Sequence, residues 1–126
     1  MSGLTAVSVN GVKRVHMLFQ SWGGFTGDGV FLYNALKKLS IDIVLYNAGQ
    51  VASAAVLAFL GAHERTTTAN AVFMIHKGIS SATGGAGVER LKAAAANLTV
   101  DDDRIEGILR THLRLPEELW VQFKLP

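Results

Sequence analysis

Two residues of this sequence have the types and the spacing that acyl-transfer chemistry requires. Ser53 follows the apolar segment 41–47 and opens an apolar stretch that runs to Leu60. His76 ends the next apolar segment, 23 residues further on. A serine at the turn from a parallel strand into a helix places its hydroxyl at the edge of the sheet. A histidine at the end of the next strand would reach that edge and could accept the serine proton.

The elements that would position this pair alternate between strand and helix patterns. The sequence predicts strands at 12–19, 41–47 and 71–76, helices at 30–39 and 52–60, and a glycine-rich loop at 20–29. Such an order implies right-handed crossovers and a parallel α/β sheet. In strand 12–19, Arg14, His16 and Leu18 share one face, and Val15, Met17 and Phe19 the other. A glycine at position 11 suits the end of a preceding helix near Asn10.

The two predicted helices differ in their apolar pattern. Helix 30–39 has a stripe of Leu32, Ala35, Leu36 and Leu39, with polar residues on the opposite side. Helix 52–60 is apolar all round and stops at Gly61, so it must be covered on every side. We expect part of that cover to come from a larger assembly.

The composition changes after His76. Segment 77–87 is rich in small residues, and 88–97 is an alanine-rich helix. Thr99 could cap a separate helix that runs to about His112, with the acidic residues 101–103 in its first turn. Its apolar stripe is Ile105, Ile108 and Leu109. Pro116 is well placed to begin a last short helix through Trp120 and Phe123.

The composition limits the class of protein. A chain of 126 residues, 49% hydrophobic and 17% charged, suits one compact domain, 1–126, with a single core. The absence of cysteine gives no disulfide framework, and no secretory signal is evident, so we expect a cytoplasmic protein. The longest apolar stretch, 51–62, is too short to cross a bilayer. A net charge of +2 gives no indication of a nucleic-acid partner.

Each candidate residue also has a simpler structural explanation. Ser53 alone could be a small residue that lets a helix start against the sheet, and His76 alone could be a hydrogen-bonded residue at a strand end. The histidines His16, His63 and His112 share no metal-ligand spacing, so we predict no metal site and no cofactor. Glycines follow the first strand, but the G-x-G-x-x-G spacing of dinucleotide sites is absent.

Three motifs together resemble one family. The segments 21–24 (SWGG) with 33–36 (YNAL), 49–55 (GQVASAA) and 74–76 (MIH) stand in the order found in the proteolytic subunit of the Clp protease, within the Clp peptidase/crotonase superfamily. The resemblance runs from about Val12 to about Trp120. It implies a Clp-type, crotonase-like fold of repeated βα units with a parallel sheet and a helical C-terminal part.

The resemblance implies a serine peptidase site. It makes Ser53 the nucleophile, His76 the general base, and the backbone N–H groups of Gly24 and Ala54 the oxyanion hole. The loop formed by Gly23, Gly24 and Phe25 would receive the substrate as an added strand. An ATP-dependent Clp-type endopeptidase acting on peptides or unfolded proteins, without a cofactor, would follow.

The same resemblance leaves the catalytic triad and the partners open. The family's third catalytic residue is an aspartate just after the helix that holds Glu117, and the sequence stops at Pro126. We therefore expect the chain to be the middle of a Clp-type subunit, with turnover lowered by on the order of 10⁴ if only the serine and histidine act.

The resemblance also implies a homo-oligomeric ring, formed through helix 52–60, segment 77–87 and region 88–112. We expect no tight binding of the family's unfoldase ATPase, because the N-terminal axial segment is short.

Two other functions remain open on the sequence. A non-catalytic subunit of the same fold would keep Ser53 and His76 without a complete triad and would serve in assembly or interaction. A crotonase-type acyl-CoA enzyme would use a similar pair of backbone N–H groups on a thioester oxyanion. A serine at the turn into the helix and a histidine on the following strand favour the peptidase over this second alternative.

Overall fold

The structure is a computed structural model that describes residues 3, 10–76 and 87–124. Its contacts divide the chain into two compact units, Met1–Met74 and Ile75–Pro126. The expected helix before Gly11 and most of segment 77–87 lie outside the described residues. Within the described part of the chain, no helix combines the length and the apolar character needed to span a membrane.

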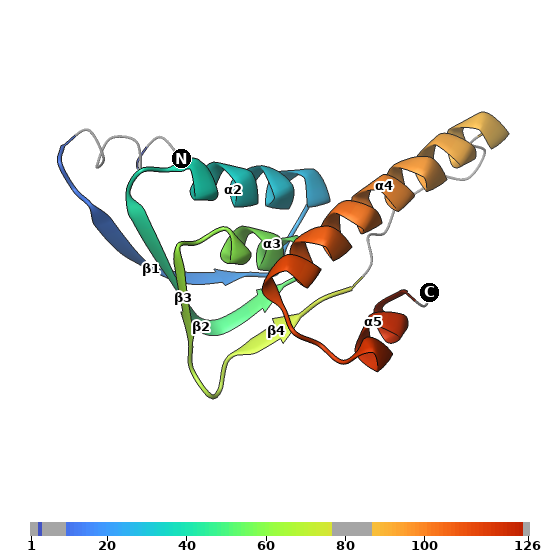
Figure 1. Cartoon of the computed structure of the whole chain (residues 1–126). Helices are drawn as coiled ribbons and strands as arrows, with labels where there is room; N and C mark the ends of the chain where they lie inside the picture. The colour runs from blue at the N-terminus through green and yellow to red at the C-terminus, as the bar shows by residue number, and fades with distance from the viewer. Residues whose placement is uncertain (1–2, 4–9, 77–86, 125–126) are drawn as a thin grey trace. The chain divides into compact units, whose positions relative to one another are not determined.

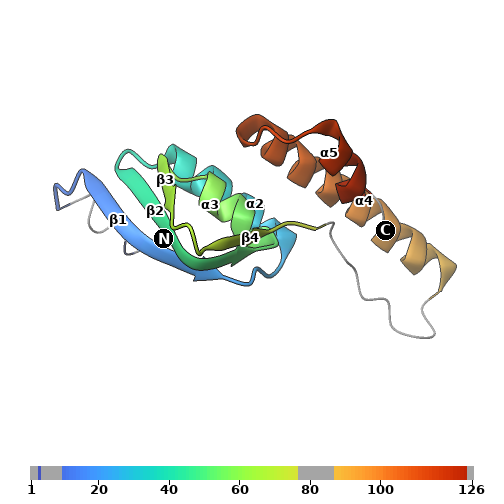
Figure 2. The same cartoon turned by 90° about the horizontal axis from the view of Figure 1, so that it is seen from below.

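The described part of the N-terminal unit is a parallel sheet with two helices. The chain runs through β1 (Arg14–Ser21), α2 (Thr26–Lys38), β2 (Asp42–Ala52), α3 (Ala54–Leu60), β3 (Glu64–Thr67) and β4 (Val72–Met74). Strand β2 pairs in parallel with β1, β3 and β4. Figure 1 shows α3 between the strands and α2, and Figure 2 shows β1, β2 and β3 running side by side. The predicted parallel α/β architecture is confirmed.

Strand β1 alternates as its sequence predicts. Exposed residues at Arg14, His16 and Leu18 alternate with half-buried Val15, Met17 and Phe19. Successive side chains of a strand point to opposite faces of the sheet. The assignment of the two faces from the sequence is therefore confirmed.

Strand β2 is longer than predicted. Its centre, Ile43 to Leu45, is buried on both faces, as expected for a middle strand of a parallel sheet. The predicted end at Asn47 is wrong, because the strand continues to Ala52. The additional residues pair with β4, in the register Gln50↔Val72 to Ala52↔Met74. This pairing carries β2 directly to Ser53.

The third predicted strand is also different in the structure. Strand β4 has only three residues, Val72–Met74, so the predicted range 71–76 is too long. A separate strand, β3 (Glu64–Thr67), was not predicted; it pairs with residues Val44 to Asn47 of β2. All four of its residues are exposed, so it lacks the apolar alternation that reveals strands in a sequence.

Helix α2 begins four residues earlier than predicted. It starts at Thr26 rather than at residue 30, and it includes Gly27 and Gly29. The predicted apolar stripe is only partly right. Of its four members Leu36 is buried, whereas the other three are half-buried. The buried face consists of Gly29, Val30, Tyr33 and Leu36.

Helix α3 forms the centre of the N-terminal unit. It begins at Ala54 rather than Ala52, and all seven of its residues are buried. The chain itself buries this helix, so the expectation that part of its cover comes from a larger assembly is wrong. Gly61 ends the helix as predicted, and it also permits close packing, since a Cβ there would lie 2.7 Å from the Tyr33 carbonyl oxygen.

The C-terminal unit contains two described helices. Helix α4 (Val88–His112) is continuous, so the prediction of two helices separated by a cap at Thr99 is wrong, and Asp101 to Asp103 lie in its interior. Neither Gly nor Pro occurs at 97–100 to interrupt it, and Asp101 pairs with Arg104 one turn later. Its C-terminal end near His112 is confirmed.

Helix α5 (Glu117–Lys124) follows Pro116 as predicted. The Pro116 carbonyl oxygen accepts hydrogen bonds from the N–H groups of Leu119 and Trp120. The Arg110 guanidinium lies 4.4 Å from the centre of the buried Trp120 ring. Hydrogen bonds to the Glu117 and Glu106 carboxylates raise the pKa of Arg110. This cluster joins the two helices.

Asn47 is the buried polar residue that joins β2 to β4. It is fully buried, its Nδ2 donates to the Val72 carbonyl oxygen at 3.2 Å, and its Oδ1 accepts from the Gly49 N–H at 3.0 Å. Both hydrogen bonds lie beside the point where β2 leaves β3 and begins to pair with β4. Asn47 therefore stabilises the chain at the point where β2 changes its pairing from β3 to β4.

We expect Asn47→Ala to lower the free energy of unfolding by about 1–3 kcal/mol, because it leaves buried polar groups without partners. Urea denaturation followed by circular dichroism measures this loss. Asn34→Ala, on the exposed side of α2, is the matched control and should change the free energy by less than about 0.5 kcal/mol. Equal effects of the two substitutions would show that Asn47 has no special structural role.

Candidate active site

Ser53 lies in a strained turn between β2 and α3. Its backbone has φ 58° and ψ −132°, and it is the one non-glycine residue with positive φ in the described part of the chain. Such a conformation costs of order 1–3 kcal/mol and persists only where the surroundings enforce it. A sharp, strained turn from strand to helix is the geometry that exposes a nucleophilic serine in α/β hydrolases.

The turn at Ser53 is held from both sides. Its N–H donates to the Met74 carbonyl oxygen at 2.7 Å, which fastens it to the end of β4. Its own carbonyl oxygen accepts from the Val56 N–H at 3.0 Å and starts α3. The Ser53 hydroxyl makes no capping hydrogen bond with the helix. The side chain is therefore not used to stabilise the helix end, as a serine at this position often is.

The loop after β1 packs directly on this turn. Gly23 has φ +99°, and a Cβ there would lie 2.8 Å from the Ala52 carbonyl oxygen and 2.8 Å from Ser53 Cβ. Real Cβ atoms do not approach so closely, so only glycine fits this position. The Gly23 N–H donates to Ser21 Oγ at 3.1 Å, which tightens the loop. A Cβ at Gly24 would meet no atom within 4 Å.

Helix α2 also packs closely on the residues that follow the turn. A Cβ at Gly29 would lie 2.5 Å from the Ala54 carbonyl oxygen, so α2 contacts the first turn of α3 backbone to backbone. This contact explains why a glycine stands on the buried face of a helix, where it normally weakens the helix. Gly23 and Gly29 thus enclose Ser53 and Ala54 from two elements.

A pocket of about 200 Å³ opens beside the turn. The residues that line it come from β1, the following loop, α2 and α3: Phe19, Ser21, Gly23, Gly24, Phe25, Asp28, Gly29, Leu32, Ala54, Ala55 and Ala58. Its wall is mostly apolar, and Ala54, which directly follows Ser53, is part of it. The pocket therefore opens directly beside the residue that follows Ser53.

The structure places most of the predicted site residues in one small region. Gly23, Gly24, Phe25 and Ala54 line the same pocket, and Gly23 contacts Ser53. Ala54 is the first residue of α3, so its N–H has no partner inside the helix. These placements agree with a site at the end of β2.

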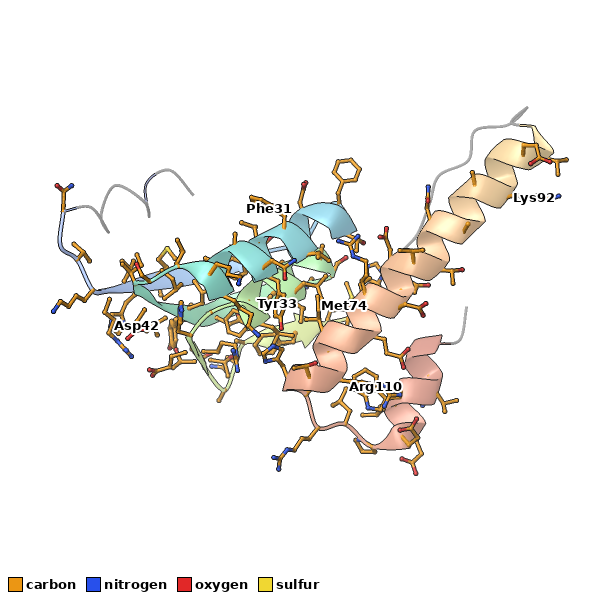
Figure 3. The ribbon with its side chains drawn as sticks, turned by 45° about the horizontal axis from the view of Figure 1, so that its top comes forward. Phe31, Tyr33, Asp42, Met74, Lys92 and Arg110 are labelled. Carbon is orange, nitrogen blue, oxygen red and sulfur yellow. The ribbon has the colours of Figure 1, made fainter. Side chains whose placement is uncertain are left out.

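His76 is an exposed residue in the C-terminal unit. It follows Met74, whose carbonyl oxygen holds the Ser53 N–H, by two residues. Figure 3 shows Met74 at the end of its strand. The pairing of His76 with Ser53 stays a prediction.

Of the residues that line this pocket, sequence reasoning indicated Gly23, Gly24, Phe25 and Ala54 and missed the others, Asp28 among them. It assigned positions 20–29 to a loop, because four glycines follow one another closely there. An acidic residue before an apolar run is a known sign of a helix start and could have placed Asp28 in the first turn of α2.

Comparison with known proteins agrees with the fold. A model of the Clp protease family matches residues 2–119. Among solved structures, the N165D mutant of ClpP1 from Listeria monocytogenes is similar, with a TM-score of 0.80 and 18% sequence identity. That match covers 96% of this chain and 67% of the Listeria chain.

This chain belongs to the Clp protease family, since the family match extends over most of its length. Its strands and helices form a Clp-type α/β fold, as the resemblance of the sequence implied.

The two glycines of α2 give a matched test of the packing around Ser53. We expect Gly29→Ala to lower the free energy of unfolding by about 1–3 kcal/mol, because the added methyl group collides with the backbone of Ala54. Gly27→Ala, in the same helix turn, meets no atom within 4 Å and should leave the free energy unchanged or raise it by up to about 1 kcal/mol. Chemical denaturation measures both; equal effects would contradict the close contact.

Proposed function

We propose that this chain is a peptidase subunit of the Clp type, with Ser53 as its nucleophile. The observation that carries the proposal is the strained positive φ of Ser53 at the junction of β2 and α3. A serine that only filled space at a helix start would have no reason to adopt this conformation. Strained residues are concentrated at functional sites, where the strain positions a reactive group.

The surroundings of Ser53 support an oxyanion hole. The Ala54 N–H lies at the N-terminus of α3, where backbone N–H groups and the helix dipole favour negative charge. Gly24, in the loop that packs on the turn, supplies the second N–H in the proposed site. Because Gly24 carries no side chain and has open space around it, a peptide backbone could approach closely.

The proposed reaction is acyl transfer. The Ser53 hydroxyl oxygen attacks the carbonyl carbon of a peptide bond while its proton passes to His76, and the Gly24 and Ala54 N–H groups hold the oxyanion. The C–N bond then breaks, and the amine leaves with the proton from His76. Water, activated by His76, hydrolyses the acyl ester and restores Ser53.

Glu117 is occupied elsewhere in the C-terminal unit. It lies in α5 and pairs with Arg110 at 3.3 Å. A carboxylate that is paired with Arg110 is a poor substitute for the triad acid. The acid that orients His76 in the proposed mechanism would come from the family's aspartate position.

Covalent labelling tests the nucleophile. A fluorophosphonate probe should form a single adduct, and peptide mapping by mass spectrometry should place it on Ser53. The Ser53→Ala variant should lose the adduct, whereas Ser40→Ala, which removes an exposed serine between α2 and β2, should keep it. Equal labelling of the Ser53→Ala variant would contradict the serine-peptidase proposal. No labelling of any form would favour a non-catalytic assembly subunit.

We also propose that the chain associates with copies of itself. Large apolar side chains are exposed on the N-terminal unit, among them Leu18 at 79%, Trp22 at 72% and Phe31 at 61% exposure. Figure 3 shows Phe31 on α2 pointing away from the sheet. Exposed apolar groups of this kind indicate contact surfaces. A ring of identical subunits would cover them.

Light scattering should therefore give a mass that is a multiple of 13.5 kDa at micromolar concentration. Phe31→Glu places a charge on the exposed side of α2 and should shift the distribution toward smaller species. Lys37→Glu, also on the exposed side of that helix, is the control for altered charge. A clean monomer in the unmodified chain would contradict self-association without affecting the fold.

A further inference from the structure

The pocket beside Ser53 contains a charged group that the proposed reaction does not use. Asp28, in the first turn of α2, lines the pocket and is exposed to solvent. Among the described residues that line the pocket it is the one charged residue. An acidic residue anywhere in this first turn would interact favourably with the helix dipole. That general role does not explain why the carboxylate stands at the pocket.

The rest of the pocket suits the apolar part of a side chain. Phe19 and Leu32 contribute large apolar groups, and Ala54, Ala55 and Ala58 form a smooth wall from α3. Pockets for whole small-molecule ligands usually measure about 300–1,000 Å³. At about 200 Å³ this pocket is smaller and suits a single side chain.

The position of the pocket identifies which substrate residue would enter it. Gly24 and Ala54, the proposed oxyanion donors, also line the pocket. A carbonyl oxygen held by these two N–H groups belongs to the residue whose acyl group is transferred to Ser53. The side chain of that same residue is therefore the one nearest to the pocket.

We propose that Asp28 makes this pocket selective for a substrate residue with an apolar stem and a cationic end, as in lysine, on the acyl side of the cleaved bond. The proposal rests on the proposed function and specifies its substrate. Lysine buries its methylene groups along apolar surface and keeps its ammonium group near water. The alanines and Leu32 would contact the stem, and the exposed Asp28 carboxylate would pair with the ammonium group.

The expected preference is modest because Asp28 is exposed. Ion pairs between exposed groups contribute little, and the measured range corresponds to about a 1.4- to fivefold difference in affinity. The preference should weaken as salt concentration rises, since salt screens exposed charges.

Equilibrium binding tests the proposal without catalysis. Two fluorescent peptides of the same sequence end in lysine amide or in norleucine amide, which has an uncharged stem. Fluorescence anisotropy with the Ser53→Ala form of the full chain should give a dissociation constant about 1.4- to fivefold lower for the lysine peptide. Asp28→Asn should abolish this preference, and Asp28→Glu should retain a preference for lysine.

Asp42→Asn is the matched control, because it removes one carboxylate at the opposite end of the sheet from Met74 (Figure 3). Asp42 pairs with Arg14 and does not line the pocket, so the preference for lysine should survive. Equal binding of the two peptides, binding of neither, or a preference that survives Asp28→Asn would each overturn the proposal. Since Ser53 is absent from these measurements, a failed labelling of Ser53 would be a separate result that concerns the proposed reaction.

Discussion

The backbone conformation of Ser53 is the constraint on which the rest of the N-terminal unit depends. A non-glycine residue at φ 58° is unfavourable, so neighbouring elements must enforce it. The Ser53 N–H is fixed to Met74 of β4, and the residues after it form a fully buried helix. If β2 ended at Asn47, the turn would have no strand beside it to accept this hydrogen bond. The extension of β2 to Ala52 therefore also helps to hold Ser53 in this conformation.

Two glycines allow the elements around the turn to approach closely enough. Gly23 brings the loop after β1 against Ser53, and Gly29 brings α2 against Ala54. The same approach creates the pocket, because the two glycines let the loop, α2 and α3 come close together there. The residues that allow this close packing are thus also residues of the proposed site. A larger side chain at either glycine would disturb the fold and the substrate region together.

Much of the fold could be read from the sequence where burial imposes a pattern. Strand β1 alternates, the centre of β2 is apolar, and α3 is apolar throughout, so their types were predicted correctly. The exposed strand β3 could not be predicted, because its residues carry no apolar pattern. The start of α2 was placed too late, because Gly27 and Gly29 are typical of a loop. The continuity of α4 was missed because Thr99 and the following acidic run imitate a helix start. For the candidate site, the order of motifs indicated Ser53, His76, Gly24 and Ala54, but not Asp28.

The sequence by itself determined that a serine stands after an apolar strand and before an apolar helix, because the order of elements and their apolar character depend on residue types along the chain. It also determined the family, through three short motifs in order. The tertiary structure decided the strained φ of Ser53, the hydrogen bond to Met74 and the pocket that includes Asp28. Each of these features depends on contacts between residues that are far apart in the sequence. The packing of α2, α3 and the strands brings those residues together.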